Sequence, residues 1–139
     1  MEASFQYPGQ IQQITKIQKD LESLRSEWDL PRAEVRQILV VIEELFSILI
    51  HDRMPDAPEF LIEVKLSTED NRIKLVIIDP GDPLNPLIPK KISGSAAFPS
   101  NNEHMGIMLI KTFVDSFNYS RENNKNIFTF YKTLKSKSN

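Results

Sequence analysis

The sequence predicts an α+β fold, because helix-like and strand-like segments occupy separate stretches of the chain. Residues 11–49 carry apolar side chains at three- and four-residue spacing, in two blocks separated by Pro31. Residues 60–79 instead alternate between apolar and polar side chains, as strands do. A second pair of short strand-like segments lies within residues 118–134.

Two long helices are predicted before the first strand. The first has one apolar stripe formed by Ile11, Ile14, Ile17, Leu21, Leu24 and Trp28. It ends near Asp29, and Pro31 opens the second helix because proline is favoured in a first helical turn. The second helix has a broad apolar face and is predicted to be largely buried; this face comprises Val35, Ile38, Val41, Ile42, Leu45, Phe46 and Leu49. Two prolines within residues 54–58 end it.

The two strands that follow form a predicted hairpin. Residues 60–66 alternate as a half-buried strand, residues 68–72 form a polar turn, and residues 73–79 form the second strand. Side chains two residues apart share a face of a strand. The face of the second strand that we expect to pack against helices therefore carries Ile73, Leu75, Ile77 and Asp79.

The remainder of the chain begins with a long loop. Residues 80–103 contain five prolines and little periodicity, and loops of this length in compact domains are usually lids or disordered segments. We predict a lid at about residues 80–105 within a single domain of residues 1–139. The other predicted elements are a helix at 106–117, strands near 118–121 and 127–134 around a turn at 122–126, and a solvated tail at 135–139.

Composition excludes several classes of function. The 139 residues are 40% hydrophobic and 26% charged, as in an ordinary soluble globular protein. The net charge of −2 and the lack of a basic cluster argue against nucleic-acid binding. The chain has no cysteine, and we find no signal peptide and no apolar run of membrane-spanning length. We therefore expect a cytoplasmic protein that does not contact a membrane.

The end of the strand at residues 73–79 is the most informative segment. A run of β-branched residues stops at Asp79, and a glycine and three further prolines follow within residues 80–86. Loops at strand ends collect functional residues, so Asp79 is a candidate ligand-binding carboxylate. The alternative is an ordinary exit from a strand into a turn, because Asp, Pro and Gly are common turn residues.

The order of these elements and three motifs resemble the histidine-kinase-like ATPase, or Bergerat, fold. More narrowly they resemble the bacterial anti-sigma-factor serine/threonine kinases. That family has Glu-Glu in its second helix, as at Glu43-Glu44, and Asp-x-Gly-x-Pro-Phe-Asp-Pro at a strand end, which residues 79–86 follow closely. Its lid ends in a glycine-rich turn that opens a helix, and residues 103–107 keep part of it. The resemblance implies a two-layer sandwich with helices on one face of a mixed, mostly antiparallel sheet.

Two departures from the family pattern bear on the chemistry. Ile48 stands where the family has an Asn that coordinates magnesium, and an aliphatic side chain offers no lone pair to a hard cation. His104 replaces a lid glycine, which removes backbone freedom where the family closes over phosphates. We therefore predict no metal ligand, including no zinc or calcium site, and we doubt magnesium binding in the manner of the family.

The resemblance also implies roles for individual residues. Asp79 accepts a hydrogen bond from the exocyclic amine of adenine, and the ligand is ATP or ADP. Glu44 contacts the nucleotide and is the general base that takes a proton from a serine or threonine hydroxyl. The alternative for Glu44 is an acid on the rim of a buried helix, paired with Arg53 or Lys90. The further nucleotide-binding residues are Gly81, Pro83, Met105 and Gly106.

Two functional classes remain open. The first is an anti-sigma-factor-like kinase that binds a sigma factor and phosphorylates an antagonist protein; Glu44, Asp79 and Gly81 favour it. The second is a non-catalytic relative that binds protein partners without phosphoryl transfer; Ile48 and His104 favour it. Whether the chain is an enzyme depends on this choice. The resemblance implies a homodimer in either case.

Overall fold

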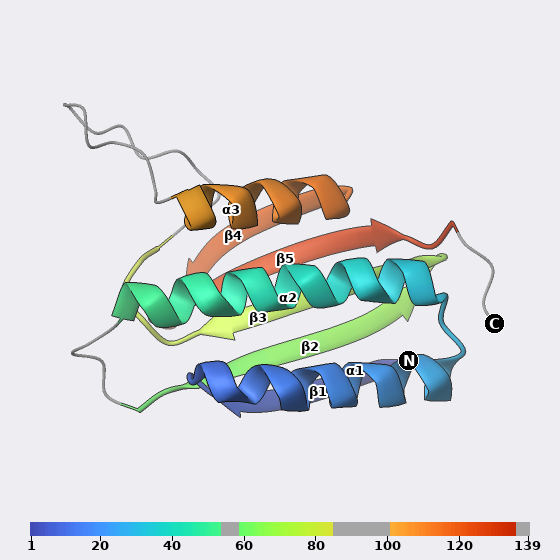
Figure 1. The fold of residues 1–139 in the computed structure, drawn as a ribbon, viewed down its shortest axis with the longest axis horizontal. Helices are drawn as coiled ribbons and strands as arrows, with labels where there is room; N and C mark the ends of the chain where they lie inside the picture. Colours follow the sequence, from blue (N-terminus) through green and yellow to red (C-terminus); the bar gives the residue numbers. More distant parts are fainter. Residues whose placement is uncertain (54–58, 85–100, 136–139) are drawn as a thin grey trace.

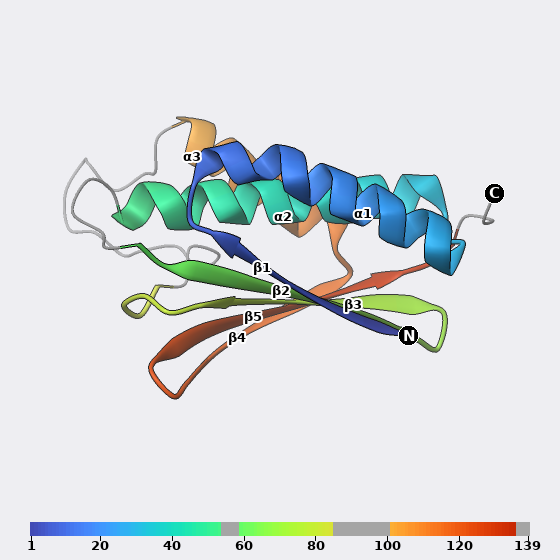
Figure 2. The ribbon, with the colours of Figure 1, turned by 90° about the horizontal axis from the view of Figure 1, so that it is seen from below.

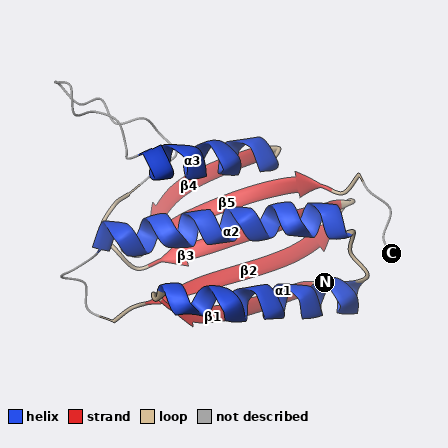
Figure 3. Ribbon diagram, in the orientation of Figure 1, coloured by secondary structure: helices blue, strands red, loops and turns tan. Residues whose placement is uncertain are grey.

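Three α-helices lie in one layer over one face of a five-stranded sheet in the described part of the chain (Figures 1 and 2). The computed structural model describes residues 1–53, 59–84 and 101–135. Figure 3 shows the helices, in blue, lying over the strands, in red. The elements are β1 (Glu2–Pro8), η1 (Ile11–Gln13), α1 (Ile14–Trp28), α2 (Arg32–Arg53), β2 (Leu61–Glu69), β3 (Arg72–Asp79), α3 (Asn101–Phe113), β4 (Ser116–Glu122) and β5 (Lys125–Thr133).

The sheet has the strand order β1-β2-β3-β5-β4. All four strand pairings are antiparallel. The expected sheet was mostly antiparallel with a parallel part, and the described strands contain no parallel pair. The α+β class and the layer of helices on one face are confirmed. The central position of β3 matters for function, because it places the end of β3 between β2 and the β4–β5 hairpin.

Strand β1 was not predicted, although its signal is present in the sequence. Glu2, Ser4 and Gln6 alternate with apolar residues along the strand. Tyr7 is buried, and its hydroxyl donates a hydrogen bond to Asp20 Oδ2 on α1 at 2.7 Å. The short edge strand therefore ties the N-terminus to the first helix.

The boundary between α1 and α2 lies where the sequence predicts it. Asp29 adopts a left-handed conformation with φ of 51°, and Leu30 N donates to Arg25 O at 2.9 Å, which closes the end of α1. Val35 N then donates to Pro31 O at 3.3 Å in the first turn of α2. The two helices thus meet at a tight, hydrogen-bonded corner.

The core fills the space between the helical layer and the sheet. The predicted apolar face of α2 is buried throughout. The sheet contributes Val64, Leu75, Phe128 and Phe130, none of which has measurable exposure. The inner face of β3 carries Ile73, Leu75, Ile77 and Asp79, which are all buried. The prediction that these four side chains share the helix-packed face is therefore confirmed.

Both hairpin turns are shorter than predicted. Asp70-Asn71 and Asn123-Asn124 are two-residue turns in which every residue has a φ between 51° and 61°. Asn and Asp tolerate this left-handed region better than most residues, and two-residue turns with positive φ match the twist of antiparallel strands. The strands around both turns consequently extend further than the predicted ranges.

Helix α3 differs from the prediction at both ends. It begins at Asn101, so residues 101–105 of the predicted lid are helical, and it ends at Phe113. The predicted helix continued to Phe117, which instead lies in β4. Asp115 redirects the chain, because its N–H donates to Tyr131 O and its carboxylate accepts from Thr133 N at 2.6 Å.

Parts of three predictions lie outside the described residues: the loop at 54–58, most of the lid at 85–100, and the end of the tail at 136–139. In the described part of the chain, no helix combines the length and the apolar character that crossing a membrane requires.

Candidate functional site

Asp79 is the last residue of β3 and is fully buried on the inner face of the sheet. It is therefore part of the strand and not a turn residue beyond it. Its partner in the register of β5 is Asn126, which is also fully buried. Side chains that lie directly opposite in antiparallel strands are neighbours. Accordingly, Asn126 Nδ2 donates to Asp79 Oδ2 at 2.9 Å.

Asn126 connects Asp79 to the turn that follows β3. Its Nδ2 also donates to Asp82 O at 2.8 Å, and its Oδ1 accepts from Leu84 N at 3.3 Å. Two side chains of β4 reach the same oxygen: the Tyr119 hydroxyl and Arg121 Nη1, the latter at 3.0 Å. The amide of Asn126 is therefore the centre of a network that joins three strands and a turn.

Arg121 fixes the backbone at Gly81. Its Nη1 donates to Gly81 O at 2.7 Å as well as to Asn126. Gly81 is half-buried beside Asp79, whereas Pro83 in the same turn is exposed. Asp79 and Gly81 are thus linked through the side chains of Asn126 and Arg121, neither of which was among the predicted site residues.

Sequence reasoning missed Asn126 because it placed this residue in the turn at 122–126. The signal was the period of two, which puts Asn126 on the same face as Phe128 and Phe130. A polar residue on an otherwise apolar strand face marks a position where a buried partner is needed.

Glu44 lies half-buried on α2, and its carboxylate packs against α3 at Gly106. A Cβ atom at Gly106 would lie only 2.5 Å from Glu44 Oε2. The absence of a side chain at Gly106 is therefore what lets the carboxylate approach the helix. Burial raises the pKa of Glu44 above its ordinary value of 4.5, and the neighbouring charge of Glu43 raises this pKa further.

The position of Gly106 corrects one expectation. The predicted glycine turn at the start of a helix is instead the interior of α3, and Gly106 is buried there. Met105, also predicted to contact nucleotide, is 63% exposed on the same helix. The described residues thus place Glu44 and Gly106 in one contact and leave Met105 at the surface. The side chains of His104, Arg53 and Lys90 lie outside the description.

Position 48, where the resemblance implies a magnesium-binding Asn, is occupied by Ile48. Ile48 lies one turn beyond Glu44 on α2 and is 8% exposed within the apolar core. In the described part of the chain, no three His, Asp or Glu side chains are grouped to hold a metal ion. Ile48 therefore offers no ligand to a magnesium ion at this position.

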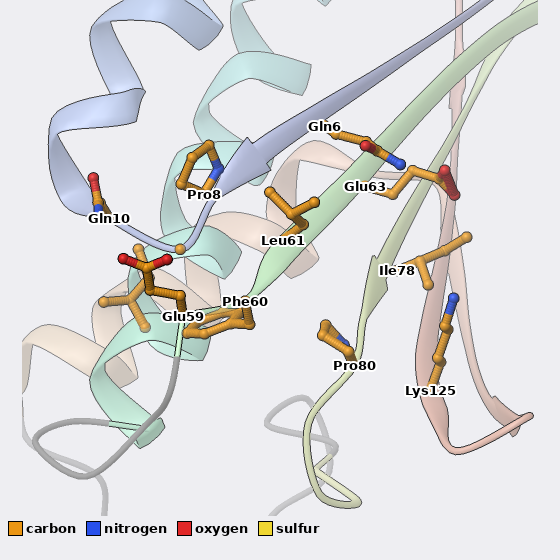
Figure 4. A pocket seen from close by; sticks show the side chains of 12 residues that line it. Gln6, Pro8, Gln10, Glu59, Phe60, Leu61, Glu63, Ile78, Pro80 and Lys125 are labelled. Carbon is orange, nitrogen blue, oxygen red and sulfur yellow. The ribbon is translucent and has the colours of Figure 1, made fainter.

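A separate groove of about 860 Å³ opens near the end of the sheet (Figure 4). It is lined by Gln6, Phe60, Glu63 and Ile78, among others. Ile78 precedes Asp79, so its side chain points to the opposite face of β3. None of the predicted site residues lines this groove, and we do not assign the nucleotide to it.

Comparison with known proteins gives a family for the chain. No curated protein matched the chain. The sequence profile of the histidine kinase-like ATPase domain matches residues 7–132, which span nearly all the described elements. The chain therefore belongs to the histidine kinase-like ATPase domain family.

Proposed function

We propose that this protein binds an adenine nucleotide, ATP or ADP, with Asp79 at the base, and acts as a regulator related to the anti-sigma-factor serine/threonine kinases. The observation that carries the proposal is the buried carboxylate of Asp79, held at the end of β3 by Asn126 in a chain of this family. The regulatory part of the proposal rests on the motifs at Glu44 and residues 79–86.

An ionised carboxylate is well suited to selecting adenine. It only accepts hydrogen bonds, and the exocyclic amine of adenine donates them. Guanine presents a carbonyl oxygen at the equivalent position, which a carboxylate repels. Because Asp79 is fully buried, a base reaches this carboxylate only when the groups that cover it move.

The active-kinase form of the proposal assigns a general base to Glu44. Its raised pKa makes its carboxylate a stronger base toward a serine or threonine hydroxyl. Gly81, Pro83, Met105 and Gly106 complete the proposed nucleotide contacts. The partners proposed for this form are a sigma factor and an antagonist protein that receives the phosphoryl group, and the proposed assembly is a homodimer.

The second candidate is a relative that binds nucleotide and protein partners without phosphoryl transfer. The buried, apolar Ile48 favours it, because magnesium normally neutralises charge that develops during the transfer. Titration of ATP with and without magnesium separates the two candidates before any activity is measured. The active form predicts that magnesium strengthens ATP binding, whereas the non-catalytic form predicts little change.

The substitution Asp79→Asn tests nucleotide recognition. Asn126 Nδ2 needs an acceptor, so the new amide directs its oxygen to Asn126 and its NH₂ group toward the ligand. The adenine amine then meets a donor. Loss of the charged hydrogen bond weakens binding by about 1.5–3 kcal/mol, or roughly ten- to a hundredfold by calorimetry.

Asp82→Asn is the matched control, because it removes the same charge from an exposed side chain in the same turn. It is expected to bind ATP like the wild type. If Asp79→Asn and the wild type bind ATP equally, Asp79 only anchors the turn. If the folded wild type binds neither ATP nor ADP at millimolar concentration, the proposed nucleotide function is wrong.

A further inference from the structure

The orientation of the Asn126 amide is fixed by its surroundings. Arg121 Nη1 and Leu84 N can only donate, and both lie at Oδ1, at 3.0 and 3.3 Å. The carbonyl of Asp82 and an ionised Asp79 can only accept, and both lie at Nδ2, at 2.8 and 2.9 Å. A flipped amide would oppose all four groups. The donors at Oδ1 and the acceptors at Nδ2 therefore both require that Asn126 direct an N–H toward Asp79.

These hydrogen bonds close a ring around the end of β3. Asp79 is held by Asn126, Asn126 by Arg121, and Arg121 by the carbonyl of Gly81, two residues beyond Asp79. The Arg121 cation draws electron density from Oδ1 of the amide, which strengthens the N–H donors on the other side. Asp79 is thereby held as an acceptor by a neutral donor, with the positive charge one residue further away.

We propose that Asn126 is a positioning residue that sets the purine selectivity of the site through Asp79. This inference rests on the proposed function, because it assumes that Asp79 faces the base. With an N–H of Asn126 directed at it, the Asp79 carboxylate accepts at Oδ2 and, when ionised, offers the base only acceptors, which selects a 6-amino purine. A carboxylate at position 126 places two acids in contact, and one of them takes up a proton. Where that proton sits on the Asp79 oxygen that faces the base, the site offers an O–H donor, which suits a 6-oxo purine.

The direct test compares ATP with inosine triphosphate, whose 6-position carries oxygen in place of the amine. Calorimetry on the wild type is expected to give at least about tenfold tighter binding of ATP. In Asn126→Asp, ATP binding falls by about ten- to a hundredfold and inosine triphosphate binding falls less, so the ratio drops at least about tenfold. Asn118→Asp is the matched control: the same chemical change on exposed β4 leaves the ratio as in the wild type.

A second pair of variants keeps the test valid if Asn126→Asp fails to fold. Asn126→Thr and Asn126→Val have nearly the same shape and both suit a strand, but only threonine retains a donor for Asp79. The threonine variant is expected to keep the preference for ATP, and the valine variant to lose most of it. Circular dichroism establishes that each variant is folded before its affinities are compared.

The outcomes separate this inference from the proposed function. If the wild type binds neither nucleotide, both ideas fail. If the wild type prefers ATP but Asn126→Asp loses both nucleotides in equal proportion, Asn126 has only a structural role, and nucleotide binding stands while selectivity through Asn126 is overturned. An equal preference for ATP in the threonine and valine variants would likewise overturn selectivity through Asn126.

Discussion

Replacing Gly106 with alanine offers a way to move the Glu44 carboxylate without touching Glu44 itself. The new Cβ atom would lie 2.5 Å from Glu44 Oε2, whereas ordinary contact begins at 3.4 Å. The carboxylate must therefore retreat by about 0.9 Å, and it can do so because it is the end of a flexible side chain. The backbone of α3 has no reason to move.

Gly106→Ala should raise the stability of the protein and displace the Glu44 carboxylate. An alanine inside a helix is favoured over glycine by about 0.5–1 kcal/mol, so Gly106→Ala is expected to be as stable as the wild type or up to about 1 kcal/mol more stable. If Glu44 acts as a general base, a misplacement of about 1 Å lowers phosphoryl transfer by roughly a hundredfold.

The assay combines thermal unfolding with titration of the Glu44 side-chain carboxyl by NMR, which needs no enzymatic activity. Burial is the main cause of the raised pKa of Glu44, so displacement toward solvent should lower this pKa toward 4.5. In a Glu44→Ala background, Gly106→Ala should only stabilise, because the contact is gone. A loss of stability with an unchanged pKa of Glu44 would refute the reasoning, since α3 would then have moved instead.

Two further predictions concern α2. Glu44→Gln is expected to stabilise the protein at neutral pH, because the raised pKa of Glu44 means that its ionised form lowers the free energy of unfolding. This loss of stability is absent at a pH below the ordinary pKa of 4.5, and it is complete at a pH above the pKa in the folded state. Urea unfolding at neutral pH and at about pH 4 checks this, and an equal effect at both would contradict it. Ile48→Asn is expected to destabilise by about 1–3 kcal/mol through a buried amide. The same variant should make ATP binding sensitive to magnesium, and unfolding and ATP titrations with and without magnesium test both effects.

The fold was predictable where burial imposes a strong local pattern. Helix α2 and strand β3 each have one buried face, so their periodicity alone indicates type and orientation. The bounds of α3 were not predictable in this way. Val114 continues the helical spacing, but Asp115 binds the backbone of β5 and ends the helix. That interaction joins residues distant in sequence, and no local pattern contains it.

The same limit explains the candidate site. Asp79 is visible in the sequence because a strand stops there and a turn motif follows. Asn126 lies 47 residues later, and its importance depends on the pairing of β3 with β5. The hairpin motif predicts that β4 pairs with β5, but it does not predict that this hairpin lies beside β3. Asn126 could therefore be recognised as the partner of Asp79 only once the strand order was known.

The two candidate carboxylates, Asp79 and Glu44, are held by different means, and this makes their proposed roles separable. Asp79 is positioned by hydrogen bonds from a buried amide, so changes at Asn126 alter what Asp79 can recognise. Glu44 is positioned by a missing side chain, so a single methyl group at Gly106 moves it while leaving the Asp79 network in place. If the protein is an active kinase, the first change affects the choice of base and the second affects transfer. If the protein only binds nucleotide, the first change retains its full effect and the second acts only through the proposed contacts of Glu44 and Gly106 with the nucleotide.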